Sequence, residues 1–181
     1  MQELEFSLVQ VYTGNGKGKT TAALGQGIRC LGAGLKVILV SFLKNSDSSE
    51  FKALDRFSPQ IRFIMANQKV RGFYWELSAE EKAETWKDCQ AAYASVLELI
   101  AERVSDVLIL DEIMAVVKYG IIPVNDVLLV MQQCRDKHIE LILTGRNAPK
   151  SILAGADLVT EMKEIKHPLA NGIRARQGIE Y

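Results

Sequence analysis

The sequence predicts an α/β protein with a mainly parallel sheet and helices on both faces. Short apolar runs typical of buried strands alternate along the chain with longer stretches that carry apolar residues at helical spacing. Polar or charged residues follow most of these runs, and in parallel sheets ligands bind beyond such carboxyl ends. The 181 residues, of which 48% are hydrophobic, are enough for one core, so we expect a single domain over residues 1–181.

Six apolar runs have the length and composition of strands. They lie at residues 6–12, 35–43, 61–65, 107–111, 141–144 and 158–165. The first leads into a loop rich in glycine and lysine, and the fourth ends in two acidic residues. The last alternates apolar and polar residues, which also indicates a strand.

Two helices are expected between the first three strands. The first covers roughly residues 19–31 and is ended by Gly32. The second is short: Asp47 and Glu50 have the spacing of a capping box, and Pro59 ends the helix.

Three more helices are expected after residue 78. Ser78 and Glu81 again have capping-box spacing, and the stretch that follows keeps apolar residues at helical intervals to about residue 104. A helix over about residues 125–137 lies between the fourth and fifth strands, and a short helix follows Pro149.

The loop after the first strand predicts a nucleoside triphosphate site. Residues 13–21 read Thr-Gly-Asn-Gly-Lys-Gly-Lys-Thr-Thr, and the glycines let backbone N–H groups face phosphate oxygens. Lys19 adds a positive charge, Thr20 supplies a hydroxyl ligand for Mg²⁺, and the next helix directs its positive N-terminal end at the same anion. Three residues separate Gly14 from Gly18, where four are usual, so this is a shortened P-loop.

Four other charged residues are candidates for the same site. Asp111, at a strand end, is most simply a carboxylate that holds Mg²⁺ together with Thr20. Glu112 has two open roles, because such a glutamate can orient water or serve the metal. Arg146 is expected to clamp a phosphate, with a surface or capping arginine as the alternative, and Lys17 either neutralises a phosphate or is a solvated loop lysine.

Composition argues against several other classes of protein. Basic and acidic residues number 22 each, so no global charge attracts nucleic acid or an anionic membrane. Cys30, Cys89 and Cys134 form no metal-ligand spacing with His138 or His167, and we expect reduced, buried thiols. No apolar stretch is long enough to cross a bilayer and no secretory signal is present, so a cytoplasmic protein is expected.

Two further segments are unusual. Residues 71–75 read Arg-Gly-Phe-Tyr-Trp, and three consecutive aromatic residues in a loop cannot all enter a core. At least one is expected to face a ligand, a partner or a lid, the alternative being a local cluster that pins the loop. Residues 166–178 are too polar and rich in glycine for a strand, and either wrap the nucleotide or pack as a tail.

These motifs together resemble the P-loop type ATP:corrinoid (cob(I)alamin) adenosyltransferase family. The matching segments are 13–23, 42–44, 72–75, 110–112, 144–146, 156–157, 165–167 and 178–181. The resemblance covers nearly the whole chain and implies a RecA-like P-loop NTPase fold. It also implies transfer of the 5′-deoxyadenosyl group of ATP to the cobalt of a reduced corrinoid, with release of triphosphate, in adenosylcobalamin synthesis or salvage.

The resemblance also implies roles for particular residues. Lys19, Thr20 and Glu112 would be catalytic, with Mg²⁺ (or Mn²⁺) held by Thr20, Glu112 and Asp111. The ATP site would comprise Thr13, Gly14, Asn15, Gly16, Lys17, Gly18, Lys19, Thr20, Thr21, Arg29, Arg146, Lys166 and His167. Phe73 and Trp75 would cover the lower face of the corrin and keep the axial base or water off cobalt. A homodimer is implied, and a reductant such as a flavoprotein is a candidate partner.

Two other functions stay open at this level. A P-loop ATPase or small-molecule kinase would use the same loop but break the terminal phosphate bond. A nucleotide-responsive module that binds a corrinoid or a protein partner would turn over negligibly. The family pattern also leads us to expect a polar residue and a tyrosine where this chain has Met114 and Ala115.

Overall fold

The computed structural model describes residues 5–43, 49–66 and 74–179, and these residues form a parallel α/β fold. The six strands are β1 (Val9–Thr13), β2 (Val37–Ser41), β3 (Ile61–Met65), β4 (Val107–Asp111), β5 (Glu140–Thr144) and β6 (Leu158–Glu161). They form one sheet in the order β3-β2-β4-β5-β1-β6, and every pairing is parallel. Strand β5 separates β1 from β4, which is a RecA-like order, so the predicted fold class is confirmed.

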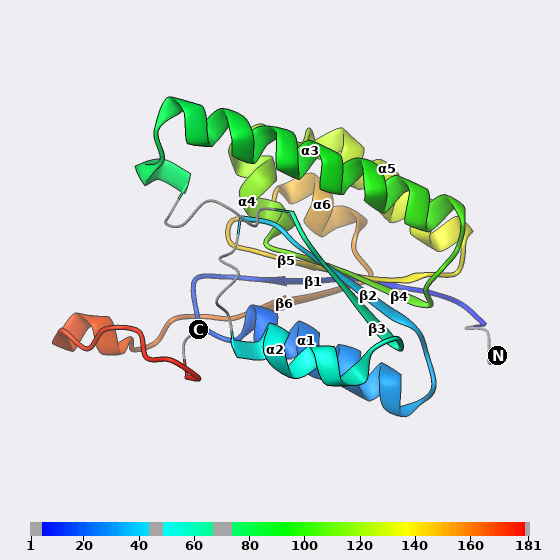
Figure 1. Cartoon of the computed structure of the whole chain (residues 1–181), viewed down its shortest axis with the longest axis horizontal. Helices are drawn as coiled ribbons and strands as arrows, with labels where there is room; N and C mark the ends of the chain where they lie inside the picture. The colour runs from blue at the N-terminus through cyan, green and yellow to red at the C-terminus, as the bar shows by residue number, and fades with distance from the viewer. Residues whose placement is uncertain (1–4, 44–48, 67–73, 180–181) are drawn as a thin grey trace.

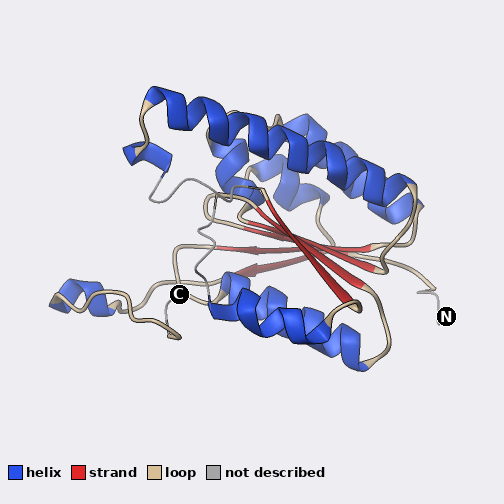
Figure 2. Cartoon of the chain, in the orientation of Figure 1, coloured by secondary structure: helices blue, strands red, loops and turns tan. Residues whose placement is uncertain are grey.

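Helices cover both faces of the sheet, as predicted. They are α1 (Lys19–Gly32), α2 (Ser49–Leu54), α3 (Ala79–Ala101), α4 (Ile113–Lys118), α5 (Val124–Asp136) and α6 (Lys150–Gly155). Short 3₁₀ helices are η1 (Asp55–Phe57), η2 (Tyr74–Glu76) and η3 (Pro168–Asn171). Figures 1 and 2 show α1 and α2 on one face of the sheet and α3 to α6 on the other.

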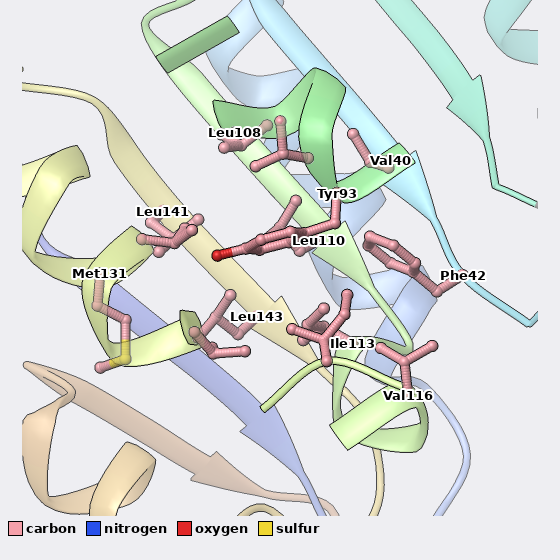
Figure 3. Close-up of a cluster of buried hydrophobic side chains, with 14 of the residues drawn as sticks. Val40, Phe42, Tyr93, Leu108, Leu110, Ile113, Val116, Met131, Leu141 and Leu143 are labelled. Atoms are coloured by element: carbon pink, nitrogen blue, oxygen red, sulfur yellow. The ribbon is translucent and has the colours of Figure 1, made fainter. Parts of the chain in front are cut away.

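Because successive strand side chains point to opposite faces, each central strand contributes to two cores. In β4, Leu108 and Leu110 belong to the cluster under α3, α4 and α5, whereas Val107 and Ile109 belong to the cluster under α1. Figure 3 shows part of the larger cluster, which brings together Tyr93 of α3, Leu110 of β4 and Leu141 of β5. Burial on both faces explains why the central strands are continuously apolar in sequence.

Helix α3 begins with the predicted capping box. Ser78 Oγ accepts a hydrogen bond from the Glu81 N–H at 3.2 Å, and Glu81 Oε2 accepts one from the Ser78 N–H at 2.8 Å. Two of the N–H groups that a helix start leaves unpaired are thereby satisfied. The residue expected to cap α2, Asp47, lies outside the described residues.

The structure shortens three predicted strands and adds one helix. The first strand begins at Val9 rather than at residue 6, the second spans Val37–Ser41 rather than 35–43, and the last ends at Glu161 rather than at 165. Strand β6 stops there because its partner β1 ends at Thr13, which pairs with Glu161, and gives way to the glycine loop. Helix α4 was not predicted, because six mostly buried residues are too few to show a helical period.

The three cysteines are free and buried, as predicted. Burial raises the pKa of Cys89 and of Cys134 to about 12, so both thiols are protonated and unreactive near neutral pH. Among the described helices, none is both long and apolar enough to cross a membrane.

Asp157 ties the start of β1 to α5. Its Oδ2 accepts a hydrogen bond from the Val9 N–H at 2.8 Å and another from Arg135 Nη2 at 2.9 Å. The backbone bond from Val9, followed by Arg135, lowers the pKa of Asp157 below its ordinary value.

We expect the stability contributed by Asp157 to depend on pH. Because the folded-state pKa is depressed, this stability is present above the unfolded-state pKa of about 3.9 and is lost as the pH falls through the folded-state pKa. Asp157→Asn should therefore lower the melting temperature at neutral pH, and by progressively less as the pH falls below about 3.9. Calorimetry across this range tests it, and an equal difference at both ends would contradict it.

Candidate active site

The loop between β1 and α1 is fixed against the chain that leaves β6. Gly14 and Gly18 have φ angles of 98° and 116°, in the region that favours glycine. A Cβ atom on Gly14 would lie 2.4 Å from the carbonyl oxygen of Met162, and one on Gly16 would lie 2.8 Å from it. That oxygen accepts the Gly16 N–H at 2.7 Å, and the Met162 N–H donates to the Thr13 carbonyl at 2.8 Å. The shortened loop therefore has a defined shape.

Helix α1 starts at this loop without a side-chain cap. Its N-cap is Gly18, which makes no side-chain capping hydrogen bond. Thr20 and Thr21 of that turn line a cavity. An uncapped helix start next to a glycine loop suits an anion, because the N–H groups and the helix dipole both favour negative charge.

Lys19 lies at the centre of the loop. The residue is only 6% exposed. Its Nζ donates hydrogen bonds to the carbonyl oxygens of Gly14 and Gly16, both at 2.8 Å. Burial lowers the pKa of Lys19, whereas the nearby carboxylate of Glu112 acts in the opposite direction. The loop thus holds the ammonium group at a fixed position beside the cavity.

The carboxylate of Asp111, at the end of β4, collects three hydroxyl groups. Its Oδ1 accepts hydrogen bonds from Thr20 Oγ1 at 2.8 Å and from Thr144 Oγ1 at 2.7 Å. Its Oδ2 accepts a longer one from Ser41 Oγ at 3.4 Å. Asp111 is fully buried. Its hydrogen bond with Thr20 brings together two residues that are predicted from sequence to share one site.

Glu112 has a backbone conformation that is unusual for its residue type. Its φ of 58° lies in the left-handed region, and it forms the N-cap of α4. Such a conformation costs about 1–3 kcal/mol and is found most often at functional sites. Its side chain lines the cavity, and its N–H donates to Thr144 Oγ1 at 2.9 Å.

The cavity beside the loop has a volume of about 1060 Å³ and is strongly cationic. Its positively charged lining residues are Lys17, Lys19, Arg146, Lys163, Lys166, Arg174 and Arg176, against the carboxylates of Glu50, Glu112 and Glu164. Apolar side chains of Leu169, Ile173 and Ile179 also line it. A cavity with this charge and an apolar part has the chemistry that binds a nucleoside polyphosphate.

One wall of the cavity is the arm, which we define as residues 162–179. Figure 1 shows it running from β6 away from the sheet and doubling back toward the loop. Its end contacts the loop, since Lys17 Nζ donates to the Ile179 carbonyl at 2.6 Å. His167 caps η3 by accepting the Leu169 N–H on Nδ1 at 3.2 Å. The arm therefore lines the cavity, and its wrapping of a nucleotide stays a prediction.

Most of the expected ATP-site residues line the cavity, with three exceptions. Thr13 and Gly14 lie beneath it, at the end of β1, and Thr13 Oγ1 accepts the Ala148 N–H at 3.4 Å. Arg29 is exposed in the last turn of α1, ten residues after Lys19. A helix rises 1.5 Å per residue, so Arg29 begins about 15 Å along the axis from the loop, and the fold of this chain does not bring it to the cavity.

Of the two expected corrinoid residues, the structure describes only Trp75. Phe73 is outside the described residues. Trp75, in η2, is 62% exposed and does not line the cavity, whereas Tyr74 packs against Tyr119 with ring centroids 4.3 Å apart. Of the two described aromatics, Tyr74 therefore packs on the fold and Trp75 is exposed, and a ligand, partner or lid at Trp75 stays a prediction.

Two details of the site were not anticipated from sequence. The backbones of Met162 and Lys163 lie against the loop, and Lys163 also lines the cavity, but nothing in their residue types distinguishes them. Thr144 bridges Asp111 and Glu112, and the available signal was a polar residue at the end of a buried strand. Met114, where the family pattern differs, is fully buried against Gly145.

The oxygen atoms at the end of β4 suit a hard cation. The donors are the Thr20 hydroxyl and the carboxylates of Asp111 and Glu112, which are the ligand types that Mg²⁺ prefers. Among the described residues, no cluster of three His, Cys, Asp or Glu side chains is present. Mg²⁺ does not need one, because it is usually held by one or two carboxylates together with water and substrate phosphates.

The fold, the glycine-lysine loop and the buried acid define a P-loop nucleotide-binding protein. The flagellar accessory protein FlaH of Methanocaldococcus jannaschii has a similar fold, with a TM-score of 0.56 over 86% of this chain and 70% of that one. The two are 16% identical, so this similarity concerns the fold alone.

The chain belongs to the ATP:corrinoid adenosyltransferase family (BtuR/CobO/CobP), whose pattern matches residues 5–181. The corrinoid adenosyltransferase CobA of Salmonella typhimurium is 35% identical over 98% of this chain and 87% of its own length. The corrinoid adenosyltransferase of a Sinorhizobium species is 34% identical over 98% of this chain and 81% of its own. That of Escherichia coli K12 is 33% identical, over 98% and 87%. The family resemblance and the enzyme class predicted from sequence are confirmed.

Proposed function

We propose that the protein transfers the 5′-deoxyadenosyl group of ATP to the cobalt of a reduced corrinoid, cob(I)alamin or a precursor. An electron pair of Co(I) forms the bond to the ribose C5′ atom. The bond between C5′ and its phosphate oxygen breaks, and its electron pair leaves with triphosphate. The observation that carries the proposal is the cationic cavity at the shortened P-loop, in a chain whose residues 5–181 match this family.

The leaving group explains the charge of the cavity. Negative charge accumulates on triphosphate as the bond to C5′ breaks, so groups that bind triphosphate better than ATP accelerate the step. Lys19, held by two loop carbonyls, is the proposed principal group. Lys17, Arg146, Lys166 and His167 line the same cavity and are proposed to neutralise the remaining phosphate charge.

Mg²⁺ or Mn²⁺ is proposed to bind with the nucleotide through Thr20, Asp111 and Glu112. When bound, the cation supplies positive charge to the phosphates and so assists the departure of triphosphate. The contribution of this chain is to fix the oxygen ligands: Asp111 is fully buried and hydrogen-bonded by the Thr20 hydroxyl.

The corrinoid is proposed to bind at the aromatic segment, with Trp75 and Phe73 against its lower face. Trp75 lies in η2, which comes after β3 and before α3 in the chain. Figure 1 shows this short helix at the same end of the molecule as the arm. An aromatic side chain that excludes the axial base or water removes a donor from cobalt, which makes reduction to Co(I) easier.

We further propose a cytoplasmic homodimer of single-domain chains, 1–181, that receives reduced corrinoid from a reductant such as a flavoprotein. Support for a dimer comes from the edge strand β6, where Leu158 and Val159 are exposed, and from Ile165 of the arm, which is 82% exposed. Apolar side chains exposed on an edge strand are a common feature of protein interfaces. Light scattering at several concentrations tests the dimer, and a monomer throughout would exclude it.

The experiment that tests the activity is anaerobic. Protein, Mg-ATP and chemically reduced cob(I)alamin should give a light-sensitive cobalt–carbon product together with triphosphate in equal amount. Formation of ADP or orthophosphate without this product would instead indicate a P-loop ATPase or kinase. A Trp75→Ala variant should keep ATP affinity and lose transfer, whereas loss of a protein partner alone would favour the binding-module alternative.

A further inference from the structure

Thr144, the last residue of β5, contacts both acidic residues at the end of β4. Its hydroxyl donates to Asp111 Oδ1 at 2.7 Å and accepts the backbone N–H of Glu112 at 2.9 Å. We propose that Thr144 is a positioning residue, which orients the Asp111 carboxylate and fixes the backbone turn that points Glu112 into the cavity. This inference rests on the proposed function, because it assumes that the two carboxylates serve the nucleotide-bound cation.

The chemistry of the bridge requires a hydroxyl group. A hydroxyl can donate one hydrogen bond and accept another at the same time, and both capacities are used here. Thr144 and Asp111 are fully buried, so water does not readily replace either bond. Removing the hydroxyl would leave the N–H of Glu112 without this acceptor and the carboxylate of Asp111 with one fewer donor.

The second half of the bridge acts on a strained residue. Glu112 has φ 58°, and the bond from its N–H to Thr144 is one of the contacts that hold it in this conformation. The end of β5 is itself fixed, because the Gly145 N–H donates to the Tyr12 carbonyl at 3.2 Å. A Cβ atom on Gly145 would lie 2.7 Å from Met114 Cβ in α4, so β5 and α4 also meet closely next to Thr144.

Position in the sheet makes Thr144 a link between the two halves of the site. Strand β5 lies between β1, which carries the P-loop, and β4, which carries the acids. The Asp111 oxygen that accepts the Thr144 hydroxyl also accepts the Thr20 hydroxyl of α1. Thr144 therefore helps to set the position of this oxygen relative to Thr20, which is also a proposed cation ligand.

The test compares Thr144→Val, which keeps the shape but not the hydroxyl, with Thr144→Ser, which keeps the hydroxyl. Ser41→Ala is the matched control, because Ser41 is also buried and donates to Asp111, but through the other oxygen, at 3.4 Å. Calorimetric titration with ATP, in EDTA and in excess Mg²⁺, gives the gain in affinity that the cation provides. It needs no corrinoid, and thermal unfolding reports whether each variant is folded.

We expect Thr144→Val to bind ATP in EDTA within about twofold of the wild type and to lose about tenfold of the gain from Mg²⁺, which corresponds to about one lost buried hydrogen bond. Thr144→Ser should retain most of the gain, and Ser41→Ala should lose less than Thr144→Val. A purely structural role would lower the melting temperature and leave the Mg²⁺ gain unchanged.

Three results would overturn the proposal: a full Mg²⁺ gain in Thr144→Val, an equal loss in Thr144→Ser, or no Mg²⁺ gain in the wild type. If Thr144→Val does not fold, Thr144→Ala against Thr144→Ser decides by the same criterion. Adenosyl transfer by the wild type is measured separately. Its absence, with the expected titrations, would reject the proposed function and leave the positioning role of Thr144 in place.

Discussion

Lys19→Met is expected to lower kcat/KM for adenosyl transfer by about 10²–10³, the cost of removing one fixed group that stabilises charge in a transition state. Lys19 is buried, and two loop carbonyls hold its ammonium group beside the cavity, so little reorganisation is needed when charge develops on triphosphate. The anaerobic transfer assay, run over a range of ATP concentrations, measures the effect. Methionine keeps the length and the apolar stem of lysine, which isolates the charge.

Lys17→Met is the matched control, since it removes one positive charge from the same loop. Lys17 is exposed and its Nζ donates to the Ile179 carbonyl of the arm. Charges near solvent are screened, so we expect a loss of at most about tenfold. Equal losses in the two variants would mean that the cavity acts through its total charge, and Lys19 would have no special role. Thermal unfolding of both variants checks that the loop has not collapsed.

Strands and the longer helices could be predicted from the sequence because local signals and tertiary packing agree there. Strand β4 is a continuous apolar run because both of its faces are buried, by Leu108 and Leu110 on one side and Val107 and Ile109 on the other. Helix α3 has a capping box whose two hydrogen bonds form as expected. Where local and global preferences coincide in this way, sequence patterns are informative.

Elements that depend on their neighbours were not predictable in the same way. The end of β6 is decided by the end of β1, since Glu161 pairs with Thr13 and no partner strand continues beyond it. Helix α4 starts at Ile113, its N-cap Glu112 makes no side-chain capping hydrogen bond, and the N–H of Glu112 is held by Thr144 at the end of β5. The residues of β6 and of α4 therefore do not by themselves predict where β6 ends or where α4 begins.

The site residues likewise divide into those that could be predicted from local sequence and those that could not. The P-loop residues and the pair Thr20 and Asp111 follow from motif spacing and strand ends, and the structure brings them together. Met162 contributes through its backbone, which the side-chain sequence does not reveal. Arg29 was assigned to ATP by resemblance alone, and the length of α1 separates it from the loop.

The backbone contact of Met162 leads to the second large effect. Gly14→Ala is expected to lower the free energy of unfolding by about 2–4 kcal/mol and to abolish measurable ATP binding. Gly14 has φ 98°, and its new Cβ would meet a backbone oxygen at 2.4 Å, not the movable end of a side chain. The loop or the start of the arm must shift, and both shape the cavity. Denaturant unfolding and calorimetric titration with ATP measure the two effects.

Gly25→Ala, in the helix that follows the loop, is the control for Gly14→Ala. It tests whether the expected loss comes from the close contact with the Met162 carbonyl oxygen or from replacing any glycine. Gly25 lies in α1, and apart from the backbone of that helix no atom of the described residues lies within 4 Å of the position that its Cβ would take. Alanine is the better helix former, so this variant should gain about 0.5–1 kcal/mol and bind ATP normally. Opposite signs for the two substitutions would show that the shortened loop needs Gly14 because the chain leaving β6 lies against it. A destabilised Gly25→Ala, or a Gly14→Ala protein that binds ATP as well as the wild type, would contradict this explanation of the loop.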